Sequence, residues 1–200
     1  MNHRALHTMA PEDSAKRHVC PWWMGYLLAS PLRRIFERPE EILAPLVAPG
    51  MTVVDVGSAM GYFSLPLARL VGPEGRVVCL DVQQRMLSAL ERRARRRGLG
   101  DVIETRLCTQ QGLAVQDLEG CAGFVLAMHV VHETENPGDF IGECSRVLGP
   151  GGRLLVAEPR GHVEAEEYAA TCDLVRACGL VDAEAPHLGK SFTALFEKPA

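Results

Sequence analysis

Short apolar runs rich in β-branched residues recur through the middle of the chain, and stretches of mixed polarity that suit helices separate them. The runs cover residues 52–56, 76–81, 102–107, 123–128 and 153–158. Strands that alternate with segments of helical length predict βαβ crossovers and a mostly parallel sheet covered by helices on both faces. The fold class predicted from this pattern is α/β, doubly wound.

The last part of the chain breaks this alternation. A helical pattern over residues 164–178 is closed by Gly179, and two short apolar runs follow at 180–185 and 191–197. The connection between these two runs is too short to hold a crossover helix, so it indicates a hairpin. The sheet is therefore expected to finish with one antiparallel strand.

The first residues follow neither pattern. Residues 1 to about 19 are polar and are expected to form a loose arm. An apolar segment over residues 22–32 contains Trp22, Trp23 and Tyr26, and it is far shorter than the roughly 20 residues of a membrane-spanning helix. We expect it to form a lid over a binding site. Packing on the core, a dimer contact and an interfacial lipid contact are the alternatives.

Length and helix signals complete the predicted organisation. Arg38, Pro39 and two following acidic residues are typical of a helix start, and Pro49 and Gly50 end that helix. A chain of 200 residues that is 47% apolar can bury one sizeable core. We expect a single domain, with an arm and lid helices over residues 1–48 and the α/β part over residues 49–200.

Charge and cysteine content narrow the function classes. The formal net charge of −4 provides no general footprint for a polyanion. We interpret five closely spaced arginines as a solvated helix face, and no nucleic-acid partner is expected: Arg92, Arg93, Arg95, Arg96 and Arg97. The seven cysteines lack C-x-x-C spacing and no secretory leader is recognisable, which favours reduced thiols, mostly in the core, and a cytoplasmic location.

The segment VVDVGSAMGYF, at residues 53–63, carries the strongest chemical signal. A strand that turns into a helix over glycines exposes backbone N–H groups to a crevice where a nucleotide-like ligand can lie. A dinucleotide enzyme would favour G-x-G-x-x-G, whereas this chain places Asp55 before Gly57, Ala59 and Gly61. A carboxylate repels pyrophosphate but suits a cofactor with an ammonium group and no phosphate, such as S-adenosylmethionine.

Asp81 strengthens this interpretation. It ends the second predicted strand about two dozen residues after Gly57, where its carboxylate can accept hydrogen bonds from both hydroxyls of a ribose. A strand-to-helix turn without any ligand is the alternative for the glycines alone. The two acidic residues together favour a nucleoside cofactor.

Four segments together resemble the class I S-adenosylmethionine-dependent methyltransferases. They are VVDVGSAMGYF, GRVVCLDVQQRML, FVLAMHVVHE and SRVLGPGGRLLVAEP. The last is similar to the small-molecule branch that includes the ubiquinone and menaquinone C-methyltransferases. The resemblance implies a seven-stranded sheet of order 3-2-1-4-5-7-6 with strand 7 antiparallel.

The resemblance also implies which residues bind the cofactor. Asp55 would face its methionine end, Asp81 would hold the ribose, and Val82 and Met86 would pack near the adenine. Four residues of the turn would line the cofactor: Gly57, Ser58, Ala59 and Gly61.

Two positions depart from the family pattern. Ala59 replaces a usual glycine, and we expect that this position needs no positive φ. The third strand is followed by Cys108, Thr109 and Gln110 instead of an acidic residue, which leaves the Gln110 amide to contact the adenine.

Residues at the exit of the fourth strand are candidates for catalysis. Methyl transfer needs a base only when the acceptor carries a proton, and His129 and His132 can supply one, with Met128 beside the cofactor. Simple backbone hydrogen bonding is the alternative for each histidine. His132 and Glu133 without a third ligand at helical spacing do not predict a metal site. Arg160 and His162 are candidates for contact with an acceptor.

Several alternatives remain for function. A small-molecule acceptor, aromatic or lipophilic, is expected, and no N-P-P-Y or P-C motif points to nucleic-acid bases. A sensor or scaffold that binds the cofactor without turnover is one alternative. An arsenite-type methyltransferase using Cys20, Cys172 and Cys178 is another, although Cys172 and Cys178 fit a buried stripe with Ala169 and Val175. A homodimer is open.

Overall fold

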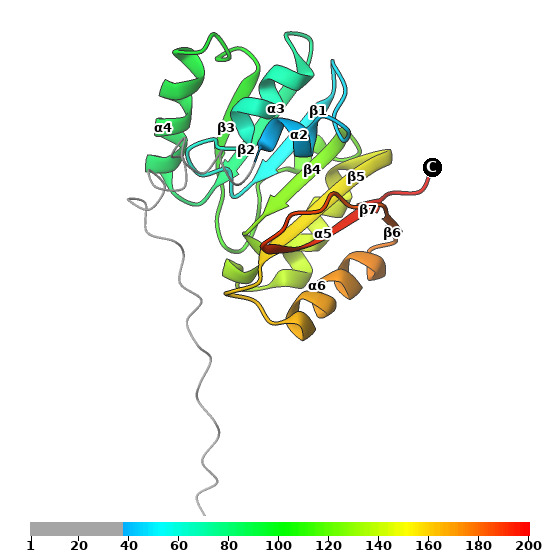
Figure 1. Cartoon of the computed structure of the whole chain (residues 1–200). Helices are drawn as coiled ribbons and strands as arrows, with labels where there is room; N and C mark the ends of the chain where they lie inside the picture. Colours follow the sequence, from blue (N-terminus) through cyan, green and yellow to red (C-terminus); the bar gives the residue numbers. More distant parts are fainter. Residues whose placement is uncertain (1–37) are drawn as a thin grey trace, which may run out of the picture.

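The computed structural model describes residues 38–200, which contain one seven-stranded sheet with helices on both faces (Figure 1). The predicted lid segment and Cys20 lie outside this range. The strands are β1 (Thr52–Val56), β2 (Arg76–Asp81), β3 (Ile103–Leu107), β4 (Ala122–Met128), β5 (Leu148–Pro159), β6 (Val181–Ala183) and β7 (Ser191–Glu197). The helices are α2 (Pro39–Leu43), α3 (Ser64–Val71), α4 (Gln84–Arg95), α5 (Pro137–Val147) and α6 (Ala165–Ala177), with short 3-10 turns η2 (Gln116–Leu118) and η3 (Val131–Glu133).

The sheet order is β3-β2-β1-β4-β5-β7-β6, which confirms the predicted topology. Strands β1 to β5 pair in parallel, while β7 runs antiparallel to both β5 and β6. The short connection before β7 therefore forms the predicted hairpin. The carboxyl ends of β1, β2 and β4 meet at one edge of the sheet, which is where open α/β sheets bind ligands.

Alternating side chains of the central strands face two separate layers of core. On one face, Val54 and Val125 pack with α5 and α6 residues such as Ile141 and Val175. On the other face, the intervening positions of these strands pack with α2, α3 and α4 through residues such as Leu43, Leu67 and Leu90. Since helices cover both faces of the sheet, side chains on both sides of the central strands are buried. This explains why the sequences of these strands are continuous apolar runs.

The ends of two elements differ from the sequence-based expectation. β5 begins at Leu148, where it already pairs with Ala122, whereas the apolar pattern predicted a start at residue 153. The apolar pattern misses the start of this strand because glycines occupy it. A Cβ at Gly149 or Gly152 would lie 2.8 Å from a backbone oxygen of the segment at the start of β4. β6 is shorter than predicted, because only Val181–Ala183 pair with β7.

The cysteines mostly behave as predicted. Cys79, Cys108, Cys144 and Cys172 are buried, whereas Cys121 and Cys178 are exposed. The expectation of a buried stripe that includes Cys178 and Ala169 is wrong.

The reason lies in α6, which packs through residues Tyr168, Thr171, Cys172 and Val175. Cys178 is the C-cap, and Gly179, with φ of 86°, turns the chain away directly after it.

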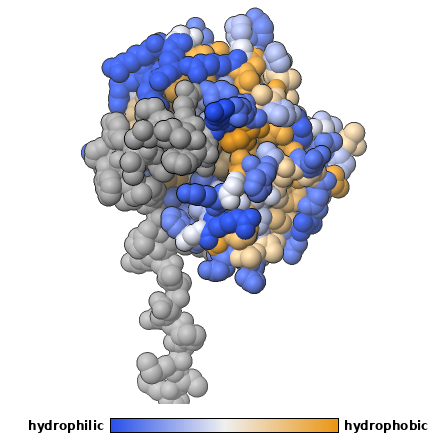
Figure 2. All heavy atoms as spheres, viewed as in Figure 1, coloured by the Kyte–Doolittle hydropathy of each residue, from blue (hydrophilic) through white to orange (hydrophobic). Residues whose placement is uncertain are grey.

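The arginine run at the end of α4 faces solvent, as predicted, with one exception. Arg92, Arg95, Arg96 and Arg97 are exposed, and hydrophilic side chains cover this end of the molecule (Figure 2). Arg93 is only partly exposed. Within residues 38–200, none of the helices has the length and apolar content to cross a bilayer.

Candidate active site

A cavity of about 630 Å³ opens at the carboxyl ends of β1, β2 and β4. The structure brings almost all of the predicted site residues to its wall: Asp55, Gly57, Ser58, Ala59, Asp81, Val82, Met86, Gln110, Met128, His129 and His132. His162 and Glu133 also line the cavity. Gly61 and Arg160 are not among the described residues of its wall.

The turn after β1 uses positive φ at three positions. Gly57 has φ of 73°, Ala59 of 46° and Gly61 of 81°. A Cβ on Gly57 would lie 2.8 Å from Val130, and one on Gly61 would lie 2.2 Å from Leu90. Gly57 therefore lets the turn approach the loop after β4, and Gly61 lets α4 pack against the turn.

The expectation that Ala59 avoids positive φ is wrong. This conformation costs an alanine about 1 kcal/mol relative to its usual regions. The backbone N–H of Ala59 donates a hydrogen bond of 2.9 Å to Oδ2 of Asp81, which holds the peptide in this orientation. The positive φ of Ala59 is thus tied to a hydrogen bond with a residue on another strand, and the local sequence does not predict it.

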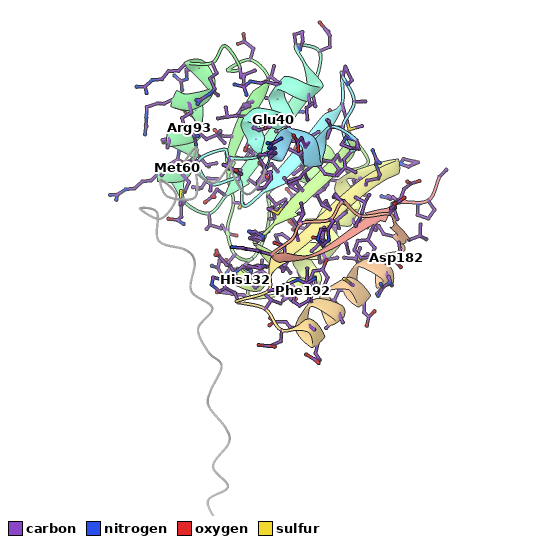
Figure 3. The ribbon with its side chains drawn as sticks, in the orientation of Figure 1. Glu40, Met60, Arg93, His132, Asp182 and Phe192 are labelled. Carbon is purple, nitrogen blue, oxygen red and sulfur yellow. The ribbon has the colours of Figure 1, made fainter. Side chains whose placement is uncertain are left out.

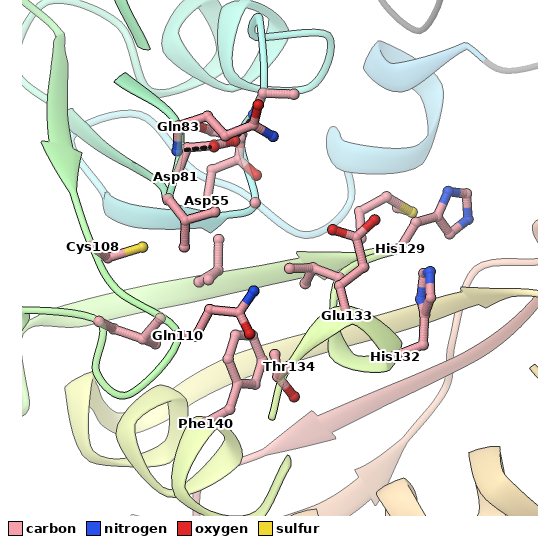
Figure 4. A pocket seen from close by; sticks show the side chains of 18 of the residues that line it. Asp55, Asp81, Gln83, Cys108, Gln110, His129, His132, Glu133, Thr134 and Phe140 are labelled. Carbon is pink, nitrogen blue, oxygen red and sulfur yellow. Dashed lines mark hydrogen bonds between the residues drawn. The ribbon is translucent and has the colours of Figure 1, made fainter. Parts of the chain in front are cut away.

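Asp81 links the turn to the end of β2. Its Oδ1 accepts a 2.8 Å hydrogen bond from the N–H of Gln83 (Figure 4), while Oδ2 accepts the one from Ala59. Burial raises the pKa of Asp81, and the two N–H groups oppose this rise. Each carboxylate oxygen has a further lone pair, so Asp81 can still accept from a ligand.

Asp55 is the more deeply buried acid of the pair. Only 2% of Asp55 is exposed, and Ser64 at the start of α3 donates a hydrogen bond of 2.6 Å to it. Burial raises the pKa of Asp55 to about 7, the Ser64 hydroxyl opposes the rise, and the negative charge of Asp81 adds to it. A cationic group entering the cavity would favour the ionised form of Asp55.

Ser58 presents an unsatisfied polar atom in the same turn. Its hydroxyl is buried and has no hydrogen-bonding partner within residues 38–200. A buried hydroxyl without a partner costs free energy, which a ligand with a polar group can recover. The turn between β1 and α3 is therefore suited to a polar ligand.

The loop after β3, residues 108–113, forms another part of the cavity wall. The side chain of Gln110 points into the cavity (Figure 4). Gln111 donates a 3.0 Å hydrogen bond to Glu135, and Glu143 accepts one of 2.5 Å from the N–H of Leu113. These bonds tie the loop to α5 and to the segment just before it, and the sequence provided no signal for either acid.

His129 is held away from the two aspartates (Figure 4). It has φ of 58°, its N–H donates to the Ala157 carbonyl, and its Nε2 lies 2.9 Å from the Ser191 hydroxyl. Arg160 donates to the Ser191 carbonyl at 3.3 Å and stacks over Phe192. The His129 Nε2 atom is thus already hydrogen-bonded at the β5–β7 edge.

His132, the second candidate base, is hydrogen-bonded to a buried acid. Its Nδ1 is hydrogen-bonded to Oε2 of Glu158, a residue that sequence reasoning missed. Burial lowers the pKa of His132, but the hydrogen bond to Glu158 and the charges of Glu158, Glu133 and Glu167 raise it by more. The ring of His162 lies edge-on, with its centroid 6.1 Å away. The result is an imidazole on the cavity wall, backed by a buried carboxylate.

Arg93 is a second residue that sequence reasoning missed. Its guanidinium reaches from α4 to the carbonyl oxygen of Met60, in the turn after β1 (Figure 3). Burial, and then the nearby charge of Arg97, lower the pKa of Arg93. One member of the arginine run therefore supports the turn instead of facing solvent.

The cysteine alternative finds no cluster in the described part of the chain. Cys172 and Cys178 are not on the wall of the cavity as far as residues 38–200 define it. Within the same residues, no group of three or more His, Cys, Asp or Glu side chains is arranged to hold a metal ion.

Residues 48–197 match the family described as methyltransferase domain. The chain belongs to this family. It is 33% identical over 136 residues to the ubiquinone/menaquinone biosynthesis C-methyltransferase of Hahella chejuensis, covering 68% of this chain and 53% of that protein. It is 31% identical over 139 residues to the ubiquinone biosynthesis O-methyltransferase of Caulobacter vibrioides, covering 68% and 51%. The chain thus spans about half the length of these curated relatives.

Solved structures share the fold. An S-adenosylmethionine-dependent methyltransferase from Aquifex aeolicus has a TM-score of 0.78 at 22% identity, covering 90% of this chain and 99% of that one. The cyclase SpnF has a TM-score of 0.62 at 23% identity, covering 74% and 58%. Because a cyclase also adopts this architecture, the chemistry has to be argued from the residues of the cavity.

Proposed function

We propose that the protein transfers a methyl group from S-adenosylmethionine to a small-molecule acceptor. The observation that carries this proposal is the pair of buried acids, Asp55 and Asp81, on either side of a glycine turn at one cavity. No lysine or arginine is found among the described residues that line the cavity. Such a lining suits a cofactor with a ribose and an ammonium group and disfavours a diphosphate.

Six of the predicted cofactor residues then have distinct roles. Asp81 accepts the ribose hydroxyls, Asp55 pairs with the ammonium group, and the Ser58 hydroxyl gains a partner. The adenine lies between Val82, Met86 and the amide of Gln110. When bound, S-adenosylmethionine supplies an electrophilic methyl group on a sulfonium sulfur.

His132 is the residue that we propose as general base. With its Nδ1 bonded to Glu158, its Nε2 can take a proton from an acceptor as far as residues 38–200 show, whereas Nε2 of His129 is bonded to Ser191. The protein otherwise aligns the acceptor and excludes water. Apolar side chains in the lining favour an aromatic or lipophilic acceptor: Met60, Tyr62, Phe63, Met128 and Phe140.

The domain division and assembly are proposed on the sequence pattern alone. Residues 1–48 are proposed as an arm with lid helices, and residues 49–200 as the methyltransferase domain. A homodimer and a cytoplasmic location stay predictions.

Calorimetric titration and methyl transfer test the proposed function together. S-adenosylmethionine and S-adenosylhomocysteine are expected to bind, and NAD is not. Methyl-labelled S-adenosylmethionine incubated with a panel of hydroxylated aromatics, quinones, thiols and amines is expected to label at least one acceptor. Binding without transfer to any fraction of a metabolite extract would favour a sensor or scaffold. A rise in melting temperature with NAD alone would contradict the proposal.

The affinity for S-adenosylmethionine is expected to rise with pH between about 5.5 and 7. The reason is that Asp55, whose pKa is raised to about 7, must lose its proton to pair with the ammonium group. The same raised pKa means that the free energy of unfolding falls as pH rises from about 4, the unfolded pKa, to about 7, and is level above that range.

Calorimetry and chemical denaturation over this pH range, with the wild type and Asp55→Asn, measure both effects. The asparagine variant is expected to bind S-adenosylmethionine more weakly. Its affinity and its free energy of unfolding should also lack the part of the pH dependence that comes from Asp55. An unchanged pH dependence in Asp55→Asn would show that another group is responsible.

A further inference from the structure

Glu158 is a buried carboxylate at the carboxyl end of β5. It is only 2% exposed. Its Oε1 accepts a 2.7 Å hydrogen bond from the N–H of Val131, and its Oε2 is bonded to Nδ1 of His132. Both of its oxygens therefore face the segment that carries the proposed base.

We propose that Glu158 is a positioning residue that keeps the proton of neutral His132 on Nδ1 and leaves Nε2 free to accept a proton from the methyl acceptor. This inference rests on the proposed function, because it assigns the supporting residue of that same site. Glu158 acts through His132 and needs no contact with the acceptor.

The hydrogen-bonding inventory determines the tautomer. A backbone N–H can only donate, so Oε1 of Glu158 must accept from Val131. A carboxylate can only accept, so with Glu158 in its carboxylate form Nδ1 of His132 donates to Oε2. In a neutral imidazole the other nitrogen, Nε2, is then the acceptor. When Nε2 takes a proton from an acceptor molecule, the adjacent carboxylate stabilises the resulting imidazolium.

The backbone on both sides of this pair is firmly held. β5 is an inner strand at this point, with Ala157 opposite Met128 of β4 and Glu158 opposite Phe192 of β7. In η3, Val131 is buried, and its carbonyl accepts a 2.8 Å hydrogen bond from the Thr134 hydroxyl. The carboxylate and the imidazole thus approach from two rigid elements.

The charged and titratable groups around His132 come from each neighbouring element. Glu158 belongs to β5, Glu133 to η3 and Glu167 to α6, and His162 lies in the connection between β5 and α6. Only Glu158 among these is bonded to Nδ1. Removal of its charge should therefore affect both the tautomer and the basicity of His132, whereas removal of a more distant charge should affect basicity alone.

Glu158→Gln provides a sharp test because it changes one atom of the pair. The amide oxygen must face the Val131 N–H, since the opposite orientation would set two donors against each other. The amide NH₂ then faces Nδ1 of His132 and places the ring proton on Nε2. In serine proteases, replacing the carboxylate of the catalytic triad with an amide lowers activity in the same way, because the histidine is held in the wrong tautomer.

Long-range ¹H–¹⁵N spectra of protein labelled at histidine measure the tautomer without any acceptor. The His132 signals are assigned by their loss in His132→Gln. In the wild type, with and without S-adenosylhomocysteine, we expect the neutral ring to carry its proton on Nδ1. In Glu158→Gln we expect the proton on Nε2 and a lower His132 pKa, while Glu158→Asp keeps the wild-type tautomer.

Kinetics with an acceptor from the labelled-methyl screen give the second measurement. Glu158→Gln is expected to lower kcat by about 10²–10⁴-fold and to move the acidic limb of the pH–rate profile to lower pH. The dissociation constant for S-adenosylmethionine should stay within about twofold of the wild type, because no cofactor residue is altered. Glu167→Gln, which removes one neighbouring charge without touching the Nδ1 contact, should retain the tautomer and most of kcat.

The outcomes separate this inference from the proposed function. A wild-type His132 with its proton on Nε2 overturns the inference, and this result needs no variant to fold. An unaltered tautomer and pH profile in folded Glu158→Gln overturns it as well. Failure of S-adenosylmethionine to bind the wild type, with the tautomer as expected, would overturn the proposed function and leave the hydrogen-bonding role of Glu158 standing.

Discussion

Replacement of Asp81 with alanine is expected to weaken the binding of S-adenosylmethionine by at least about a hundredfold. A hydrogen bond to a charged group contributes about 1.5–3 kcal/mol, so two ribose contacts correspond to two or more powers of ten in the dissociation constant. Asp81 also holds the N–H groups of Ala59 and Gln83, so its loss relaxes the turn that faces the cofactor. Calorimetric titration of the purified variant measures the effect directly.

Asp117→Ala is the matched control for this variant. Asp117 is another aspartate, but it is ion-paired with Arg106, belongs to η2 and is not on the described wall of the cavity. Its removal should leave cofactor binding unchanged. Wild-type affinity in a folded Asp81→Ala protein, verified by circular dichroism, would disprove the ribose assignment.

Replacement of His132 with glutamine is expected to lower kcat by about 10²–10⁴-fold, the usual contribution of a general base. The affinity for S-adenosylmethionine should change little, since His132 is assigned to the acceptor and not to the cofactor. Methyl-transfer rates measured at saturating cofactor, beside calorimetry on the same preparation, separate the two effects.

Two other histidines serve as comparisons. His187→Gln alters an exposed residue outside the described cavity wall and should leave kcat unchanged. His129→Gln should have a smaller effect than His132→Gln, because the His129 Nε2 is already bonded to Ser191. If His129→Gln abolished transfer while His132→Gln retained it, the base would have to be reassigned to His129.

The sequence could predict those parts of the site that depend on local pattern. Asp55 and Asp81 can be predicted because Asp55 is the last residue but one of its apolar run and Asp81 is the last, and in parallel strands those ends meet at one edge of the sheet. His129 and His132 were found in the same way, at the exit of β4. The turn at Gly57 follows from its place between a strand and a helix.

The hydrogen bonds that these residues make with distant parts of the chain could not be predicted from the sequence. Whether Ala59 has positive φ depends on Asp81, which is 22 positions away along the chain. Arg93 looked like part of a solvated basic face, yet its side chain reaches the Met60 carbonyl 33 positions away. The acids Glu135 and Glu143 act on a loop that follows a different strand.

The amino-acid pattern alone therefore determined the order of strands and helices along the chain, the α/β class and the place of the two acids and two histidines at the strand ends, because periodicity and turn residues act over a few positions. Only the tertiary structure decided which partner each histidine has. Glu158 meets His132 across 26 positions and Ser191 meets His129 across 62, through the pairing of β4, β5 and β7. Such pairs depend on strand register and side-chain direction, which no local pattern specifies.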